Sequence, residues 1–139
     1  MYRYENTDLA YTAGIVDGEG CIGIYARDKR KNHMYRAEVR VHNTSEWLCN
    51  WLKSTYGGRV YLSNPKRNAN TKPCWMWQIT GRDCLSFLDV ISLYLHLKKS
   101  QAELAIQFLG ARHGSGHISS RDEWIIAQNQ KMQMHELNK

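Results

Sequence analysis

The chain has 139 residues and a mass of 16.2 kDa, which is enough for one domain with its own hydrophobic core. Hydrophobic residues make up 42% of it and charged residues 23%, a balance that excludes a disordered chain. There are 19 lysines and arginines against 13 acids, so the net charge of +6 favours a polyanionic partner such as nucleic acid.

Cysteine spacing and apolar runs favour an intracellular protein with no contact to a membrane. The cysteines lie at positions 21, 49, 74 and 84 without a CxxC pair, which disfavours a zinc ribbon. Residues 1–10 are polar and contain no apolar segment typical of a signal peptide. No run approaches the ~20 apolar residues that cross a bilayer. We therefore expect reduced thiols and no secretion.

Hydrophobic periodicity predicts an α+β fold with the order α-β-β-α-β-β-α-α and one four-stranded antiparallel sheet. Asp8, Thr44 with Ser45, and Asp83 are the expected caps of the first three helices. The predicted elements are a helix at 9–17, strands at 21–27 and 34–43, a helix at 45–58, strands at 59–63 and 74–80, and helices at 84–97, 100–112 and 121–139.

Apolar stripes predict which side chains form the core. In the second strand, Ala37, Val39 and Val41 alternate with polar residues, as in a sheet with one buried face. The five tryptophans also lie on apolar stripes, and we expect all of them in the core. The stripe of the second helix is Trp47, Leu48, Trp51 and Leu52.

The segment TAGIVDGEG, residues 12–20, resembles the signature of the LAGLIDADG homing endonucleases. Ala13, Gly14, Asp17 and Gly20 are identical to the signature, and Thr12 in place of its leading leucine is the one clear departure. The element order from about residue 8 to 110 and the segment LHLKKSQAEL at 95–104 resemble the family as well. The resemblance implies a single LAGLIDADG domain over 1–139, with a core at about 8–110 and a helical extension at 111–139. It also implies an organelle, either chloroplast or mitochondrion, or a bacterial or phage cytoplasm.

Small side chains recur along the first predicted helix. Ala10, Ala13, Gly14 and Asp17 fall at i, i+3, i+4 and i+7, so one face is nearly bare and lets another helix approach closely. A contact within the same chain is the alternative. Because the sequence has a single segment of this kind, we expect the same helix of a second subunit as the partner, in a two-fold homodimer.

Pairing two such helices would bring two Glu19 carboxylates together, which is stable only with divalent cations between them. The resemblance implies that Glu19 and the backbone oxygen of Gly18 bind Mg²⁺, with Mn²⁺ or Ca²⁺ as substitutes for binding. Two such centres would serve hydrolysis of both DNA strands. Asp17 is expected to cap or pin the local backbone rather than to bind metal.

The resemblance also assigns supporting catalytic roles to two residues. Lys98 matches the family lysine that stabilises charge or assists the attacking water, and Lys99 is the neighbouring alternative. Asn43, at the end of the second strand, lies where relatives often carry Gln or Asn in the water network, and His42 is the competing candidate.

The polar face of the predicted sheet is expected to enter the major groove of DNA, where Arg recognises guanine, Gln adenine and Glu cytosine. The basic turns at 29–31 and 66–67 are expected to bind phosphates, which fixes register rather than sequence. The predicted DNA-binding residues are Tyr25, Arg27, Lys29, Arg30, Arg36, Glu38, Arg40, Arg59, Tyr61, Ser63, Lys66, Arg67, Met76 and Gln78.

The function implied by the resemblance is that of a site-specific homing endonuclease. Such a homodimer binds a long, pseudo-palindromic site in double-stranded DNA and cleaves both strands with Mg²⁺, leaving 3′ overhangs. Two alternatives on the same fold stay open. An intron maturase would bind RNA as a splicing cofactor, and a non-catalytic DNA-binding protein would not need Glu19.

Overall fold

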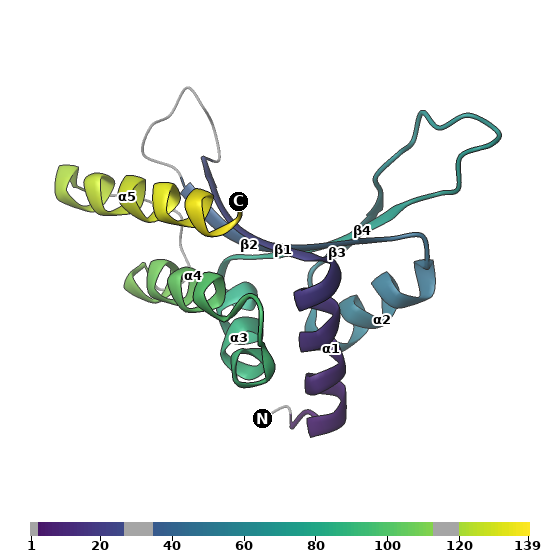
Figure 1. The fold of residues 1–139 in the computed structure, drawn as a ribbon, viewed down its shortest axis with the longest axis horizontal. Helices are drawn as coiled ribbons and strands as arrows, with labels where there is room; N and C mark the ends of the chain where they lie inside the picture. The colour runs from purple at the N-terminus through teal and green to yellow at the C-terminus, as the bar shows by residue number, and fades with distance from the viewer. Residues whose placement is uncertain (1–2, 27–34, 113–119) are drawn as a thin grey trace.

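The computed structural model describes residues 3–26, 35–112 and 120–139 (Figure 1). Their order of helices and strands confirms the predicted α+β class. In these ranges no helix has the length and apolar character to cross a membrane. The elements are α1 (Asn6–Glu19), β1 (Gly20–Ala26), β2 (Tyr35–Asn43), α2 (Glu46–Tyr56), β3 (Arg59–Leu62), β4 (Trp75–Thr80), α3 (Gly81–Ile91), the 3-10 turn η1 (Ser92–Tyr94), α4 (Lys99–Ala111) and α5 (Arg121–Leu137).

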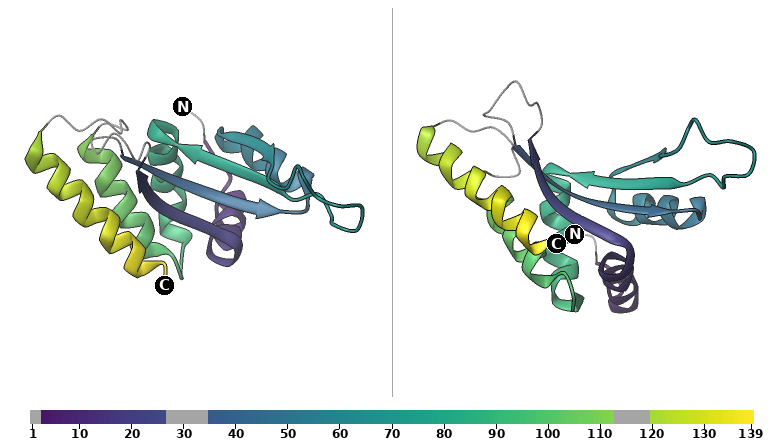
Figure 2. Two further views of the ribbon diagram at one scale, coloured as in Figure 1. Left: turned by 90° about the horizontal axis from the view of Figure 1, so that it is seen from above. Right: turned by 45° about the horizontal axis from the view of Figure 1, so that its top comes forward.

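The four strands form one antiparallel sheet, as predicted, and the structure gives their order as β1-β2-β4-β3. Helices α1, α2, α3 and α4 lie beneath one face of the curved sheet, and α5 lies beside α4 near the β1 edge (Figures 1 and 2). The Asn138 side chain ties the end of α5 to this edge, because its Nδ2 donates to the Ile22 carbonyl at 2.9 Å. No described helix covers the opposite face, which therefore stays available to a partner.

The core lies between the sheet and the helices. Val39 in β2 faces Ile22 in β1 and Ile79 in β4, and all three are buried. Trp77 is fully buried, as predicted. The prediction for Trp47 is wrong: this side chain is 65% exposed. The buried stripe of α2 consists instead of Leu48, Cys49, Leu52 and Tyr56.

Two predicted helix starts are also corrected. Helix α1 begins at Asn6, so Asp8 lies within its first turn, where its charge complements the helix dipole. Helix α3 begins at Gly81, so Asp83 also lies within the first turn, where its charge complements the helix dipole. The predicted cap of α2 is confirmed, because Ser45 Oγ accepts a hydrogen bond from a backbone amide of the first turn at 3.2 Å.

Thr12, the departure from the LAGLIDADG signature, is fully buried against α2. Its Oγ1 lies 2.7 Å from the hydroxyl of Tyr56 in a hydrogen bond. Burial raises the pKa of Tyr56, and the bond from Thr12 lowers it only in part. A polar residue is therefore tolerated at this apolar position because its hydroxyl has a partner on the neighbouring helix.

We expect Tyr56→Phe to lower the free energy of unfolding by about 1–2 kcal/mol, because it leaves the Thr12 hydroxyl buried without its partner. The double variant Thr12→Val/Tyr56→Phe should cost less than the sum of its single changes, since it removes both ends of the bond. Denaturant titrations measure both effects, with Tyr94→Phe as the control. Strict additivity of the two changes would contradict this account.

Candidate active site

Helix α1 runs directly into β1 at Gly20, with no loop between them. A Cβ at Gly20 would lie 2.8 Å from Val16 Cα and 2.9 Å from the Val16 carbonyl oxygen. Only glycine fits this close approach, so the final glycine of the signature is a packing requirement. Glu19 is thereby held, exposed, at the corner between the helix and the sheet.

Asn43, at the end of β2, contacts Glu19. Its Nδ2 donates to Glu19 Oε2 at 2.7 Å. The backbone amide of Ser45 donates to Asn43 Oδ1 at 2.7 Å, which fixes the amide so that its donor end faces the carboxylate. Of the two candidates at this strand end, Asn43 rather than His42 is the residue that meets Glu19.

Lys98 lies under the end of α1. Its Nζ donates to the carbonyl oxygens of Val16, Asp17 and Gly20 at 3.0, 3.1 and 2.6 Å. Carbonyls in the last turn of a helix have no partner within the helix, and a cation there also complements the helix dipole. The Gly18 carbonyl is not among these acceptors, so Lys98 leaves free the oxygen that the resemblance assigns to metal.

Asp17 makes the converse contact, with its carboxylate bound to the loop before α4. It accepts hydrogen bonds from the backbone amides of His96, Leu97 and Lys98 at 2.8, 3.1 and 3.0 Å. Burial alone would raise the pKa of Asp17, but these bonds and the nearby His96 hold it below 3.8. Asp17 therefore pins backbone, as predicted, but the backbone is that of a distant segment and not the local one that the sequence led us to expect.

We call these two sets of bonds the reciprocal contact: Asp17 holds the backbone of residues 96–98, and Lys98 holds the backbone of residues 16–20. It also explains why the helix predicted at 84–97 is interrupted. Helix α3 ends at Ile91, η1 follows, and the amides at 96–98 point to a carboxylate instead of continuing a helical ladder. Lys99 begins α4 and is exposed.

The open face of α1 differs from the predicted one. Ala13 was expected at a dimer interface, but it is fully buried in the core of its own chain, so this prediction is wrong. Ala10 is exposed, and a Cβ at Gly14 or Gly18 would meet nothing within 4 Å. The bare face therefore follows Ala10, Gly14 and Gly18, at i, i+4 and i+8, and Asp17 turns its carboxylate toward its own chain.

Two exposed aromatic rings and a half-buried one lie beside this bare face, an arrangement that the periodicity does not predict. Tyr11 is 51% exposed, and its ring packs edge-on against Trp51 at 5.6 Å. Trp51 in turn stacks on the exposed Trp47 at 6.2 Å. We call these three residues the aromatic ledge. Only the structure reveals it, because α1 and α2 must first be placed side by side.

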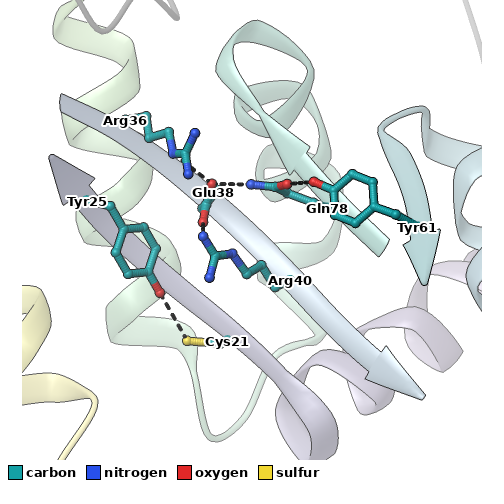
Figure 3. A network of polar contacts seen from close by, with 7 residues as sticks. All are labelled: Cys21, Tyr25, Arg36, Glu38, Arg40, Tyr61 and Gln78. Atoms are coloured by element: carbon teal, nitrogen blue, oxygen red, sulfur yellow. Dashed lines mark hydrogen bonds and ion pairs between the residues drawn. The ribbon is translucent and has the colours of Figure 1, made fainter. Parts of the chain in front are cut away.

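The uncovered face of the sheet carries most of the predicted DNA-binding residues. Tyr25, Arg36, Arg40, Met76 and Gln78 are partly buried on the strands, and Arg59 and Tyr61 are exposed on β3. Ser63, Lys66 and Arg67 are exposed in the loop after β3. Arg27, Lys29 and Arg30 lie outside the described residues. Glu38 was expected to be exposed on this face, which is wrong: it is 0% exposed, beneath Arg36 and Arg40 (Figure 3).

The donors at the end of α1 are oxygens, namely the Glu19 carboxylate and the Gly18 carbonyl. Within the described ranges, no group of three or more His, Cys, Asp or Glu side chains gathers as a metal cluster. Hard oxygen donors in small number, completed by substrate phosphates and water, are the typical environment of Mg²⁺. The donor set thus matches a shared magnesium site better than a zinc site.

No protein-family model and no curated protein matches the sequence. Solved structures do share its fold. The homing endonuclease I-CvuI, in complex with DNA, has a TM-score of 0.74 and 22% identity over 94% of this chain and 82% of its own. The archaeal intron-encoded endonuclease I-Vdi141I, also complexed with DNA, has a TM-score of 0.77 and 11% identity over 98% and 87%. The LAGLIDADG meganuclease I-AabMI has a TM-score of 0.68 and 18% identity over 88% of this chain but 43% of its own. The chain thus has the LAGLIDADG homing endonuclease fold.

Asp17→Asn tests the reciprocal contact through pH. We expect this change to lower the free energy of unfolding at pH 7 by about 1 kcal/mol, because a charged acceptor binds the three amides more strongly and solvent screens part of the gain. The folded pKa lies below the unfolded value of 3.8. The stabilisation is therefore fully present above pH 3.8 and is lost as the pH falls through the folded value.

Denaturant titrations from pH 7 down to pH 2 measure this difference. Asp89→Asn, a change at an exposed acid of α3, is the matched control. A stability difference between wild type and Asp17→Asn that stays constant over the whole range would contradict the proposed anchoring charge.

Proposed function

We propose that this protein is a site-specific homing endonuclease that binds a long, pseudo-palindromic site in double-stranded DNA as a homodimer. It hydrolyses both strands with a divalent metal ion, preferably Mg²⁺, and leaves 3′ overhangs. The observation that carries the proposal is the convergence of Glu19, Asn43 and Lys98 at the end of α1, at one margin of a sheet with an uncovered polar face.

Glu19 and the Gly18 carbonyl are the residues that would hold the metal. When bound, Mg²⁺ supplies Lewis-acid chemistry, which lowers the pKa of water and stabilises negative charge on a phosphate. Asn43 holds one oxygen of the Glu19 carboxylate by a 2.7 Å hydrogen bond, so the carboxylate is oriented and would present its other oxygen to a metal ion.

Lys98 supports this site in two ways. Its Nζ binds three carbonyls at the end of α1 and thereby fixes the backbone on which Gly18 and Glu19 lie. The same ammonium group places a positive charge next to the site, where it would stabilise negative charge that develops on the phosphate. The neighbouring Lys99 is exposed at the start of α4 and lies outside this set of bonds.

The homodimer is supported by the bare face of α1. Ala10, Gly14 and Gly18 leave room for a second backbone to approach, and the aromatic ledge adds exposed apolar surface beside them. The chain also corresponds to 43% of the longer I-AabMI chain, as expected for one half of a two-part enzyme. A two-fold dimer would bring two Glu19 residues to a common axis, each above one DNA strand.

A DNA partner is supported by charge and by the solved structures with the same fold. The chain carries a net charge of +6, and exposed Arg59, Lys66 and Arg67 lie at one end of the polar face or in the loop beyond it. I-CvuI and I-Vdi141I were both solved in complex with DNA, I-CvuI in the presence of 2 mM Mg or 2 mM Ca. Electrostatic attraction to phosphates of this kind makes binding strongly dependent on salt.

Glu19→Gln should reduce cleavage by roughly 10³-fold while DNA binding is retained, because the amide lacks the anionic oxygen that the metal needs. The experiment selects cleaved sites from a random DNA library with Mg²⁺, then measures cutting and binding of the selected site. Glu46→Gln, which removes the same charge at an exposed position of α2, is the control.

Equal loss of cutting and binding would contradict the role of Glu19. Wild-type binding without cutting would indicate a non-catalytic protein, and preference for RNA a maturase.

Gly14→Leu should convert the dimer to a monomer without unfolding the chain. A side chain at Gly14 meets nothing within 4 Å in its own chain, and leucine favours the helix by roughly 0.5–1 kcal/mol over glycine. Sedimentation velocity measures the dimer, and circular dichroism checks the fold. Ser86→Leu, at an exposed position of α3, is the control. A Gly14→Leu protein that stays dimeric would refute this interface.

A further inference from the structure

Glu38 is an anomaly on the uncovered face of the sheet. Its side chain belongs to the polar side of β2, yet it is 0% exposed, whereas its neighbours on that side are partly open to solvent. A buried carboxylate is costly unless opposite charges and hydrogen bonds compensate for the lost water. Glu38 therefore needs cations and hydrogen-bond donors around its carboxylate, and the side chains that supply them are held in place by it.

Three side chains close over the Glu38 carboxylate (Figure 3). Arg36 Nε lies 3.0 Å from Oε2, and Arg40 Nη2 forms an ion pair with Oε1. Gln78, from the neighbouring β4, donates its Nε2 to Oε2. Arg36 and Arg40 keep side-chain exposures of 38% and 31%, so both remain accessible to a base edge although their carboxylate partner is not.

The arrangement extends across all four strands. Tyr61 of β3 donates its hydroxyl to Gln78 Oε1, and the Arg40 guanidinium lies 4.9 Å from the centre of the Tyr25 ring of β1. Glu38 pairs with Gly23 of β1 in the sheet register. A Cβ at Gly23 would lie within 2.5 Å of the Tyr25 ring, so glycine is needed there for the ring to fold over the sheet.

The contacts leave the recognition atoms of the arginines free. In the described part of the chain, the ion pair of Arg36 uses Nε, so both Nη groups remain for the two acceptors of a guanine edge. Arg40 is held through one Nη. A hollow of about 480 Å³ opens beside Arg36, Arg59, Tyr61 and Gln78, which gives a DNA backbone or base edge access to this group.

We propose that Glu38 is a specificity-determining positioning residue: without touching DNA, it holds Arg36, Arg40 and Gln78 in the orientations that recognise base edges. This inference rests on the proposed function. Without the carboxylate, the two guanidinium groups would lose their common anchor and repel each other. They would then turn toward phosphates, which attract any cation irrespective of sequence. Specificity would fall while non-specific attraction would rise.

Glu38→Gln tests this inference, because it keeps the size of the side chain and removes its charge. The experiment selects bound duplexes from a random DNA library in Ca²⁺, with the wild-type chain and each variant. We expect discrimination at the base pairs contacted by Arg36 and Arg40 to fall by roughly 5- to 150-fold each. Non-specific affinity should be retained or rise, and its salt slope should steepen by about 0.9 for each new phosphate contact.

Glu103→Gln, with the same charge change at an exposed site on α4, is the control and should leave the consensus unchanged. In an Arg36→Gln/Arg40→Gln background, Glu38→Gln should cause no further loss at those base pairs, because it acts through the arginines. The triple variant keeps the test decisive if Glu38→Gln alone is unstable, since it contains neither the buried carboxylate nor the two guanidinium groups. The double background keeps the buried carboxylate without its ion pairs, so the stability of both proteins is measured beside their consensus.

Two results would overturn the inference alone: an unchanged consensus in Glu38→Gln, or a parallel loss of specific and non-specific binding that follows its loss of stability. A wild-type chain that selects no consensus would overturn the proposed function, and this inference with it.

Discussion

The reciprocal contact between Asp17 and Lys98 is the interaction on which the rest of the site depends. Six hydrogen bonds connect residues about 80 positions apart in the sequence, and each of the two side chains binds backbone groups at a helix end or in a loop. Together with the tight turn at Gly20, they determine where α1 stops. Glu19 is the next side chain along, so its position follows from backbone bonds rather than from its own contacts alone.

This construction separates chemistry from recognition. The carboxylate, amide and ammonium groups lie at the end of α1, whereas the side chains that we propose to recognise bases lie along the strands of the uncovered face. If two copies pair through α1, each presents the same face to one half of the DNA, and the target must be nearly palindromic. In this proposal, the buried Glu38 supports the residues that recognise DNA, and Asp17 supports the residues that cleave it.

Much of this could be predicted from the sequence, because the signature and the element order are local patterns. The four-stranded antiparallel sheet, Glu19, Asn43 and Lys98 all follow from them, and the structure brings these three residues to one place. The burial of individual side chains could not be predicted with the same accuracy. Small residues occupy more than one side of α1, so periodicity alone does not show that Ala13 packs inward while Gly18 stays open. Alternation places Glu38 on the polar side, but only its neighbours determine its depth.

The central claim is that two α1 helices lie side by side and bring two Glu19 carboxylates to a shared site above the DNA. A crystal structure of the chain with its selected duplex and Ca²⁺ measures this most directly. We predict two protomers in contact through Ala10, Gly14 and Gly18, with cations on the order of 4 Å apart between the two acids and the scissile phosphates. One protomer bound alone, or two Glu19 residues far apart and without metal, would contradict the account.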